Sequence, residues 1–248
     1  MIKVTILGCG SSTGVPVIAC RCAICKSNNP FNHRTRSAAL IQSSTTTVLV
    51  DCGFDIRFQL LKAGVEHIDA VILTHHHADH IMGLDHLRIF AHNNNVPIPI
   101  YTDHTTTLVC NFIFGYLQHL NQVIYKQVKL DDHITIGDIP IQLFKQLHSD
   151  VDSIGFRVGN FIYANDVRDF PEASQQWLYN AETLVIDCKE YVDTSAHLGL
   201  PGVLKWSNIF KPKNVFLTNM SHKIDYNELC SKTPQNFRPC YDGIQFET

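Results

Sequence analysis

The segment from Thr74 to His80 constrains this chain more than any other part of its sequence. It reads THHHADH and follows the apolar run Val71-Ile-Leu, which predicts a buried strand ending at these residues. Side chains converge where such a strand turns into a helix. Imidazole nitrogens are suitable ligands for zinc, iron or manganese, and an added carboxylate helps a second cation to bind beside the first. A surface tag or buried core histidines are the alternatives, but H-x-H-x-D-H after an apolar strand favours a metal site. Its expected ligands are His75, His77, Asp79 and His80.

The rest of the chain alternates short apolar runs with helical patterns. β-Branched and aromatic residues predict strands at residues 2–7, 38–42, 47–51, 70–74, 98–101, 141–146, 155–158, 161–164, 184–187 and 214–218. Helical periodicity predicts helices at residues 55–63, 80–91, 105–119, 171–178 and 202–209. Hairpins come first and interleaved strands and helices follow, so we expect an α/β or α+β layered sandwich. With 248 residues and no repeat or linker, we interpret residues 1–248 as a single domain.

Composition and charge exclude several classes of protein. Hydrophobic residues make up 45% and charged residues 17%, which is globular rather than disordered composition. The net charge of −3 gives no reason to expect nucleic acid or an anionic membrane as a partner. No apolar run approaches the length of a membrane span, and the first residues lack the core of a signal peptide. We therefore expect a cytoplasmic protein with reduced thiols, and we leave a homodimer open.

Three of the nine cysteines are clustered as C-x-C-x-x-C at Cys20, Cys22 and Cys25. Three thiolates within six residues suit one zinc ion but leave a tetrahedral site one ligand short. A nucleophilic role or three free surface thiols are the alternatives. The spacing favours a closed structural zinc site, carried on an insertion at about residues 17–36.

The H-x-H-x-D-H segment, preceded by a strand ending in Asp51 within VLVDCG, resembles the signature of the metallo-β-lactamase superfamily. The resemblance implies a four-layer αβ/βα sandwich with two divalent metals, zinc or manganese, at one edge of the sheets. It also implies that His148 in KQLHSD and Asp166 in FIYAND are ligands, and that Asp51 supports the ligands without binding metal. One metal would then be held by His75, His77 and His148, the other by Asp79 and His80, with Asp166 between them.

The chain departs from the superfamily pattern at Asn219. The last metal ligand of the superfamily is usually a histidine in a short L-T-H segment, and here the segment reads Leu217-Thr-Asn219. An amide oxygen is a weaker ligand for a transition metal than imidazole, so Asn219 is a doubtful ligand. The second site is then looser, differently occupied or empty.

A closer resemblance covers nearly the whole chain. The sequence is similar to the cyclic phosphodiesterases of the carbon-phosphorus lyase pathway, which process a phosphoribosyl cyclic phosphate. The shared features are Gly8-Cys-Gly10, Gly14-Val-Pro16, the cysteine cluster, Arg36-Ser37, THHHADH, His148-Ser149, Ile186-Asp-Cys188, His197, Leu217-Thr-Asn-Met-Ser-His222 and Tyr241-Asp-Gly243. This resemblance implies that His222 completes the structural zinc site, that His197 is the general acid, and that Asp79 and His197 take part in the reaction.

Three functions remain from different classes. The resemblance favours a metal-dependent phosphodiesterase that hydrolyses a small cyclic or nucleotide-like phosphodiester. Hydrolysis of a thioester or lactone, or processing of tRNA 3′ ends, is the second, although no basic surface supports the tRNA version. A metal-binding accessory protein with weakened catalysis is the third, and only Asn219 favours it. The retained polar ligands argue against it, because a site without function has no need to keep them together.

Overall fold

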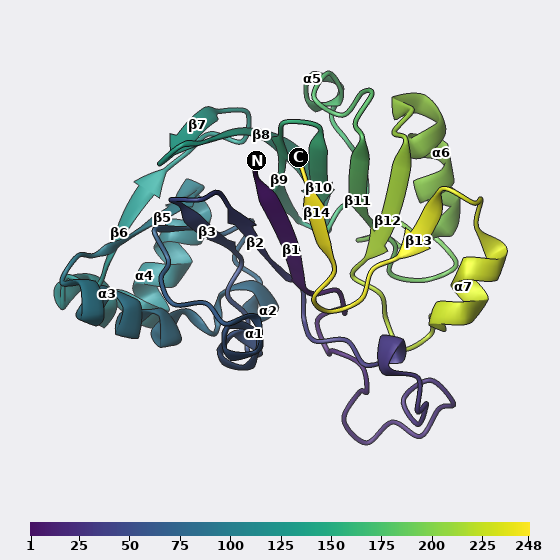
Figure 1. The fold of residues 1–248 in the computed structure, drawn as a ribbon, viewed down its shortest axis with the longest axis horizontal. Coiled ribbons are helices and arrows are strands. Elements are labelled where there is room, and N and C mark those ends of the chain that lie inside the picture. Colours follow the sequence, from purple (N-terminus) through teal and green to yellow (C-terminus); the bar gives the residue numbers. More distant parts are fainter.

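The computed structural model describes residues 1–248 and contains two seven-stranded sheets that face each other (Figure 1). The first sheet has the strand order β14-β1-β2-β3-β4-β5-β6, with β1 to β3 antiparallel and β3 to β6 parallel. Its strands are β1 (Lys3–Gly8), β2 (Ala38–Gln42), β3 (Thr47–Val50), β4 (Ala70–Ile72), β5 (Ile98–Thr102), β6 (Val123–Gln127) and β14 (Gln245–Glu247).

The second sheet has the order β13-β12-β11-β10-β9-β8-β7. It is antiparallel from β7 to β10 and parallel from β10 to β13. Its strands are β7 (His133–Ile136), β8 (Ile139–His148), β9 (Val151–Val158), β10 (Phe161–Ala164), β11 (Thr183–Asp187), β12 (Asn214–Thr218) and β13 (Phe237–Pro239).

Helices cover the outer face of each sheet, so the layers run helix, sheet, sheet, helix (Figure 1). The first group is α1 (Ile56–Ala63), α2 (Ala78–Ile81), the 3-10 helix η2 (Leu84–Leu87), α3 (Arg88–Asn94) and α4 (His104–His119). The second group is α5 (Glu172–Gln175), α6 (Leu200–Phe210) and α7 (Tyr226–Lys232), and a 3-10 turn η1 (Pro30–Asn32) lies between β1 and β2. The expected αβ/βα sandwich is thereby confirmed.

Strands β1 to β4 of the first sheet are buried on both faces, which explains why they read as continuous apolar runs. In β3, Val48 and Val50 pack between the two sheets, whereas Leu49 packs under the outer helices. Because strand side chains alternate between faces, neighbouring residues enter different cores. One cluster of 41 buried residues fills the space between the sheets and continues under α6 and α7, and a second cluster of 20 lies under α1 to α4. These strands of the first sheet are therefore packed from both sides.

The helix predicted at residues 80–91 is wrong as one element, because α2, η2 and α3 divide this part of the chain. The break lies at Gly83, where an added Cβ atom would come 2.1 Å from the carbonyl oxygen of Gly53. At Gly53 an added Cβ would come 1.8 Å from the carbonyl oxygen of Asp79. The two backbones therefore touch, and the turn carrying Asp79 and His80 is held against the loop after β3 by tertiary contact.

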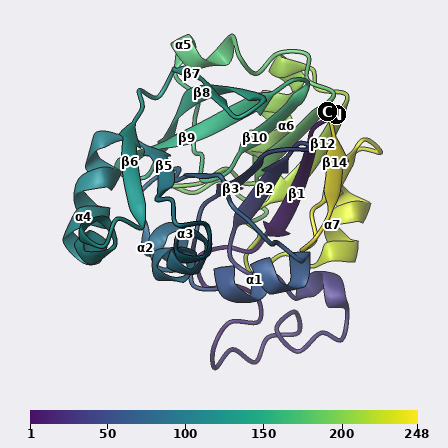
Figure 2. The same cartoon turned by 60° about the vertical axis from the view of Figure 1, so that its left-hand side comes forward.

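The segment between β1 and β2 is a long excursion outside the two sheets (Figure 2). Arg34 fastens it, because its buried guanidinium donates hydrogen bonds to the carbonyl oxygens of Ser221 (3.2 Å) and Ile224 (2.9 Å). The two termini lie side by side, with Ile2 and Thr248 joined by backbone hydrogen bonds of 3.0 and 2.9 Å. No helix is long and apolar enough to cross a membrane.

Candidate metal centre

Four polar residues follow directly after strands and adopt a left-handed backbone. The φ angles are 61° at Asp51, 49° at Ser149, 50° at Asp166 and 59° at Asn219. A positive φ is uncommon for residues other than glycine and costs conformational energy, so it persists only where the surroundings demand it. These residues follow β3, β8, β10 and β12 and lie at one edge of the sandwich, which marks that edge as the functional region.

Three histidine nitrogens converge at this edge. Nε2 of His75 lies 2.9 Å from Nδ1 of His77, which lies 3.2 Å from Nε2 of His148. Two ligand nitrogens on a tetrahedral zinc are about 3.3 Å apart, given Zn–N bonds of about 2.05 Å. The observed spacing fits a metal ion at the centre of the three rings, and the structure brings together the three residues expected for the first metal.

The surroundings keep this trio in the form that binds metal. Burial lowers the pKa of His75 well below its ordinary value and also lowers the pKa values of His77 and His148. Imidazole must be neutral to offer a lone pair to a metal. The second ring nitrogen of His148 is held as well, since Nδ1 donates to the carbonyl oxygen of Ala196 at 2.9 Å. A fixed tautomer orients the ligand.

A second group of possible ligands lies beside the first. Nε2 of His80 is 3.0 Å from Oδ2 of Asp166 and 3.3 Å from Oδ2 of Asp79. Oδ1 of Asp166 points the other way and lies 3.8 Å from Nε2 of His148. Asp166 thus has one oxygen toward each group, which is the arrangement of a carboxylate shared between two metals.

Asp51 lies behind the second group of possible ligands. Its carboxylate accepts a hydrogen bond from Nδ1 of His80 at 2.7 Å and from the backbone and hydroxyl of Thr74 at 2.8 to 3.1 Å. Burial alone would lower the pKa of His80, but the carboxylates of Asp51, Asp166 and Asp79 outweigh it and raise that pKa well above its ordinary value. Asp51 therefore fixes the tautomer and orientation of His80.

Asn219 is buried at the same site, but its amide nitrogen faces the carboxylates. Nδ2 donates to Oδ1 of Asp166 at 2.9 Å and to Oδ2 of Asp187 at 3.3 Å. The oxygen and nitrogen of an amide are assigned here from this hydrogen-bond pattern. In this orientation Asn219 acts as a hydrogen-bond donor to the shared carboxylate and not as a metal ligand.

His197 is the residue next to both groups, and it is held at both ring nitrogens. Nδ1 donates to Oδ2 of Asp187 at 2.7 Å, and Nε2 accepts from Nζ of Lys189 at 2.8 Å. Burial would lower the pKa of His197, but the Asp187 carboxylate outweighs it, and the pKa is raised. An imidazole oriented by a buried carboxylate is suited to donate a proton to a leaving group.

These groups open into a pocket of about 320 Å³. Its lining includes Ser12, His77, Asp79, His148, Ser149, Asp166, Lys189, His197 and Asn219. The pocket is small and polar, which suits a compact anionic substrate better than a long apolar one.

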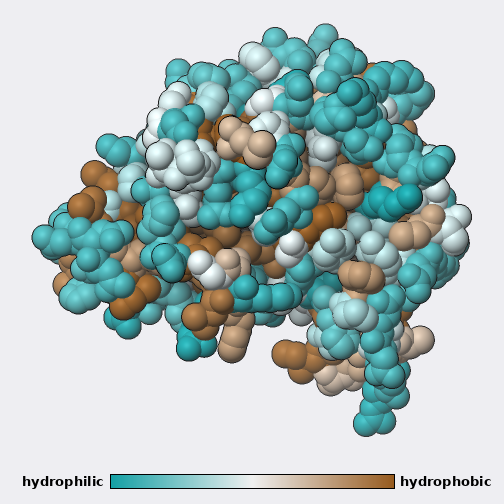
Figure 3. All heavy atoms as spheres, viewed as in Figure 1, coloured by the Kyte–Doolittle hydropathy of each residue, from teal (hydrophilic) through white to brown (hydrophobic).

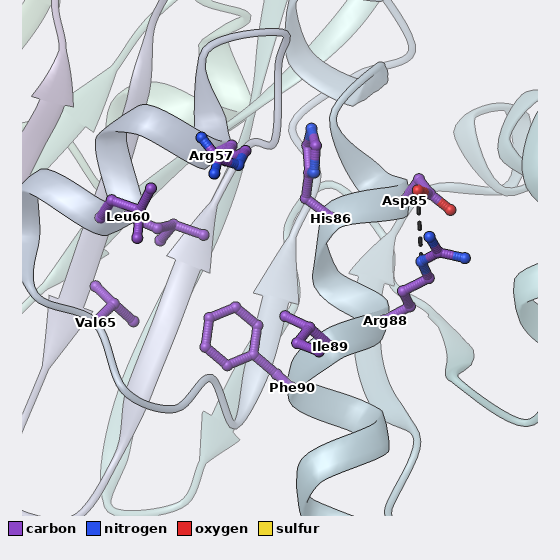
Figure 4. A pocket seen from close by; sticks show the side chains of 9 residues that line it. Arg57, Leu60, Val65, Asp85, His86, Arg88, Ile89 and Phe90 are labelled. Carbon is purple, nitrogen blue, oxygen red and sulfur yellow. Dashed lines mark ion pairs between the residues drawn. The ribbon is translucent and has the colours of Figure 1, made fainter.

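A different pocket of about 380 Å³ lies between α1 and the η2–α3 segment (Figure 4). Leu60 and Val65 face Ile89 and Phe90 across it, and the one ion pair joins Arg88 to Asp85 at 3.6 Å. Figure 3 shows apolar atoms at the lower left of a mostly hydrophilic face. This pocket contains none of the metal-binding groups, so the chemistry belongs to the polar pocket.

The structure brings the cysteine cluster and His222 together. Nδ1 of His222 lies 3.3 Å from Sγ of Cys20, 3.6 Å from Sγ of Cys22 and 3.7 Å from Sγ of Cys25. A tetrahedral zinc with ordinary bond lengths places sulfur and nitrogen about 3.6 Å apart. The backbone N–H of Cys25 donates to Sγ of Cys22 and lowers the pKa of that thiol to about 6, so a thiolate is available at neutral pH.

Sequence reasoning missed the roles of Asp187 and Lys189. Asp187 ends an apolar strand in the same way as Asp51, and this pattern was the signal that could have found it. Lys189 carries no such signal, because a lysine after a strand is most often a surface residue.

Comparison with known proteins places the chain in a family. The family model for the beta-lactamase superfamily domain matches residues 46–220, so the chain belongs to the beta-lactamase superfamily, a class of hydrolases. A solved structure of a diphosphatase from the PhnP family matches with a TM-score of 0.95 and 30% identity, covering 100% of this chain and 97% of that one. Within the superfamily, the chain is therefore a member of the PhnP family.

Curated relatives are more distant and carry different names. An octanoyltransferase from Porphyromonas gingivalis is 26% identical over 98% of this chain and 51% of that protein. A ribonuclease Z from Methanopyrus kandleri is 27% identical over 52% of this chain and 46% of that protein. The chain thus spans about half the length of these two relatives.

Proposed function

We propose that this chain is a metal-dependent phosphodiesterase that hydrolyses a small cyclic or nucleotide-like phosphodiester. The observation that carries the proposal is the pair of ligand groups that share Asp166, with the His197–Asp187 pair beside them in one polar pocket. The likeness to a PhnP-family diphosphatase supports the same class of substrate.

His75, His77 and His148 would hold one metal, and Asp79 and His80 the other, with Asp166 shared. Bound divalent metals would supply positive charge for the phosphate oxygens and acidity for a water molecule. His197 lines the pocket. With Nε2 protonated and released from Lys189, His197 would donate that proton to the leaving oxygen, and Asp187 would stabilise the charged imidazole. Zinc and manganese both suit this mixture of nitrogen and oxygen ligands. At the separate structural site, we propose that Cys20, Cys22, Cys25 and His222 hold zinc.

The test is hydrolysis of bis(p-nitrophenyl) phosphate by the purified chain, with zinc or manganese added in turn. Asp187→Asn keeps the shape of the side chain but removes its charge, so we expect kcat to fall by about a hundredfold with little change in metal content. Asp131→Asn is a matched control at an exposed aspartate outside the pocket. Absence of turnover with every metal would contradict the proposal and favour an accessory, metal-binding protein.

Thioester hydrolysis is the second candidate, because a relative called an octanoyltransferase matches 98% of this chain. An octanoyl thioester assayed beside the phosphodiester distinguishes the two. A higher kcat/KM for the thioester would replace the first proposal with the second.

A further inference from the structure

Helix α1 and the residue pair before it carry an apolar stripe that faces solvent instead of the core. The stripe consists of Phe54, Phe58 and Leu61, whose spacing of four and three residues places them on one helical face. They are 50%, 68% and 65% exposed, whereas Ile56 and Leu60 on the other side of the helix are buried. A surface helix normally turns its polar face to water. Packing within one chain therefore does not explain the stripe.

An apolar groove runs beside the stripe. It is the pocket of about 380 Å³ between α1 and the η2–α3 segment, where Leu60 and Val65 face Ile89 and Phe90 (Figure 4). Ile89 is itself 53% exposed. The same surface thus presents both a ridge, which is the stripe, and a groove. Helices associate when the ridge of one enters the groove of another, so this surface has the form that a further helix would fit.

The exposed apolar area is that of a stable dimer interface. A side chain of this size has roughly 200 Å² of surface, so the stripe and Ile89 together expose roughly 450 Å². A standard interface buries roughly 800 Å² on each partner, of which roughly 60% is apolar. A patch of this size is more than scattered surface residues provide, and it marks a site of interaction with a protein.

The charges at the two ends of α1 indicate which protein fits. Arg57 lies in the first turn and Glu66 lies just after the last turn, and both are exposed. Neither forms an ion pair, and the neighbouring carboxylate of Asp55 binds Arg36 instead, at 3.0 Å. A copy of α1 packed antiparallel on this face would bring opposite charges together at both ends of the helix pair. The surface is therefore complementary to itself.

We infer that this face, formed by the stripe, Ile89 and the groove, binds a second copy of the chain about a two-fold axis. A two-fold interface uses the same patch on both subunits, so the stripe of each copy enters the groove of the other. An ion pair between Arg57 and the partner's Glu66, formed twice, sets the antiparallel direction. None of these residues lines the polar pocket, so the inference does not depend on the proposed function.

The test is the mass of the purified chain, measured by analytical ultracentrifugation over a range of concentrations. We expect the wild type to have twice the 28.0 kDa of one chain. Leu61→Glu places a charge in the middle of the interface, so we expect the dissociation constant to rise by about a hundredfold or more. Phe112→Glu is the matched control, because Phe112 is 92% exposed on α4, outside this face, and it should leave the dissociation constant unchanged.

A charge exchange tests the direction of packing and guards against variants that dissociate because they misfold. Arg57→Glu places two carboxylates together at each end, so the dissociation constant should rise by about tenfold. The double variant Arg57→Glu, Glu66→Arg should restore it. A wild type that stays monomeric at about 100 μM would overturn the inference. So would a Leu61→Glu variant that remains dimeric, a Phe112→Glu variant that dissociates, or a double variant no tighter than Arg57→Glu.

Discussion

Asn219 affects how strongly the second group of candidate ligands can bind a metal. Its amide nitrogen donates to Asp166 and Asp187, so it neutralises part of the carboxylate charge that would otherwise attract a cation. The remaining candidate ligands of that group are Asp79, His80 and Asp166. A histidine at position 219 would present an imidazole nitrogen lone pair, whereas the amide of Asn219 presents an N–H group. Imidazole is the stronger ligand for a transition metal.

We therefore expect Asn219→His to tighten the second metal by about tenfold and to raise phosphodiesterase activity at limiting metal. Metal content and activity should be measured together across a titration. Asn219→Ala is the control, because it removes the donor without adding a ligand, and Asp79→Ala should abolish activity at every metal concentration. Unchanged occupancy and activity in the histidine variant would show that position 219 does not adjoin the second metal.

At the scale of elements, the turn that carries Asp79 and His80 depends on contact between two glycines. A methyl group at Gly83 would collide with the carbonyl oxygen of Gly53 and with Cγ2 of Ile56, at 2.1 and 2.5 Å. We expect Gly83→Ala to lower the free energy of unfolding by about 2 kcal/mol, the usual cost of overpacking, and to weaken metal binding because the turn shifts. Denaturant unfolding and metal titration measure the two effects.

Gly115 provides the matched control for that substitution. It lies within α4, and an added Cβ atom would meet nothing within 4 Å. Gly115→Ala should be neutral or stabilise the protein by up to about 1 kcal/mol through helix propensity. Equal stability of both alanine variants would contradict the account of the α2–η2 break.

The cysteine site joins the excursion between β1 and β2 to the segment after β12. Cys22→Ser removes a thiolate from a closed set of four ligands, so we expect the melting temperature to fall by about 5 °C or more. Hydrolysis per folded molecule should change little, because these ligands do not line the polar pocket. Cys230→Ser, outside the cluster, serves as the control, and an equal melting temperature in both variants would argue against a stabilising zinc.

Across the whole molecule, the two candidate metal sites differ in how open they are. The cysteine set has four converging ligands, whereas the histidine and aspartate groups face a pocket and include the weak position at Asn219. We expect purified protein to retain one zinc ion after mild chelation while the metal at the histidine site exchanges. Metal analysis before and after dialysis against a chelator tests this. Fewer than one metal per chain in carefully isolated protein would contradict it.

The sequence predicted best those elements whose structure depends on residues close to one another in the chain. β2, β10 and β12 begin and end at the predicted residues, because their mostly buried positions carry short β-branched and apolar runs that stand out from the flanking turns. The exposed β6, the short edge strands β7, β13 and β14, and the helix α7 were not predicted. Edge strands contain polar residues, so their hydrophobic pattern is weak. Which of their residues are buried is decided by neighbours that are distant in the sequence.

The sequence by itself determined the family of the chain, the sandwich fold and the residue types of both candidate metal sites, because each depends on short motifs and strand periodicity. Only the tertiary structure decided that Asn219 donates to Asp166, that Asp187 and Lys189 hold the two nitrogens of His197, and that Gly53 and Gly83 divide the predicted helix. Each of these contacts joins loops at strand ends that approach one another only when the strands of one half of the sandwich have paired and packed. Their geometry therefore has no local cause that a pattern of residues could reveal.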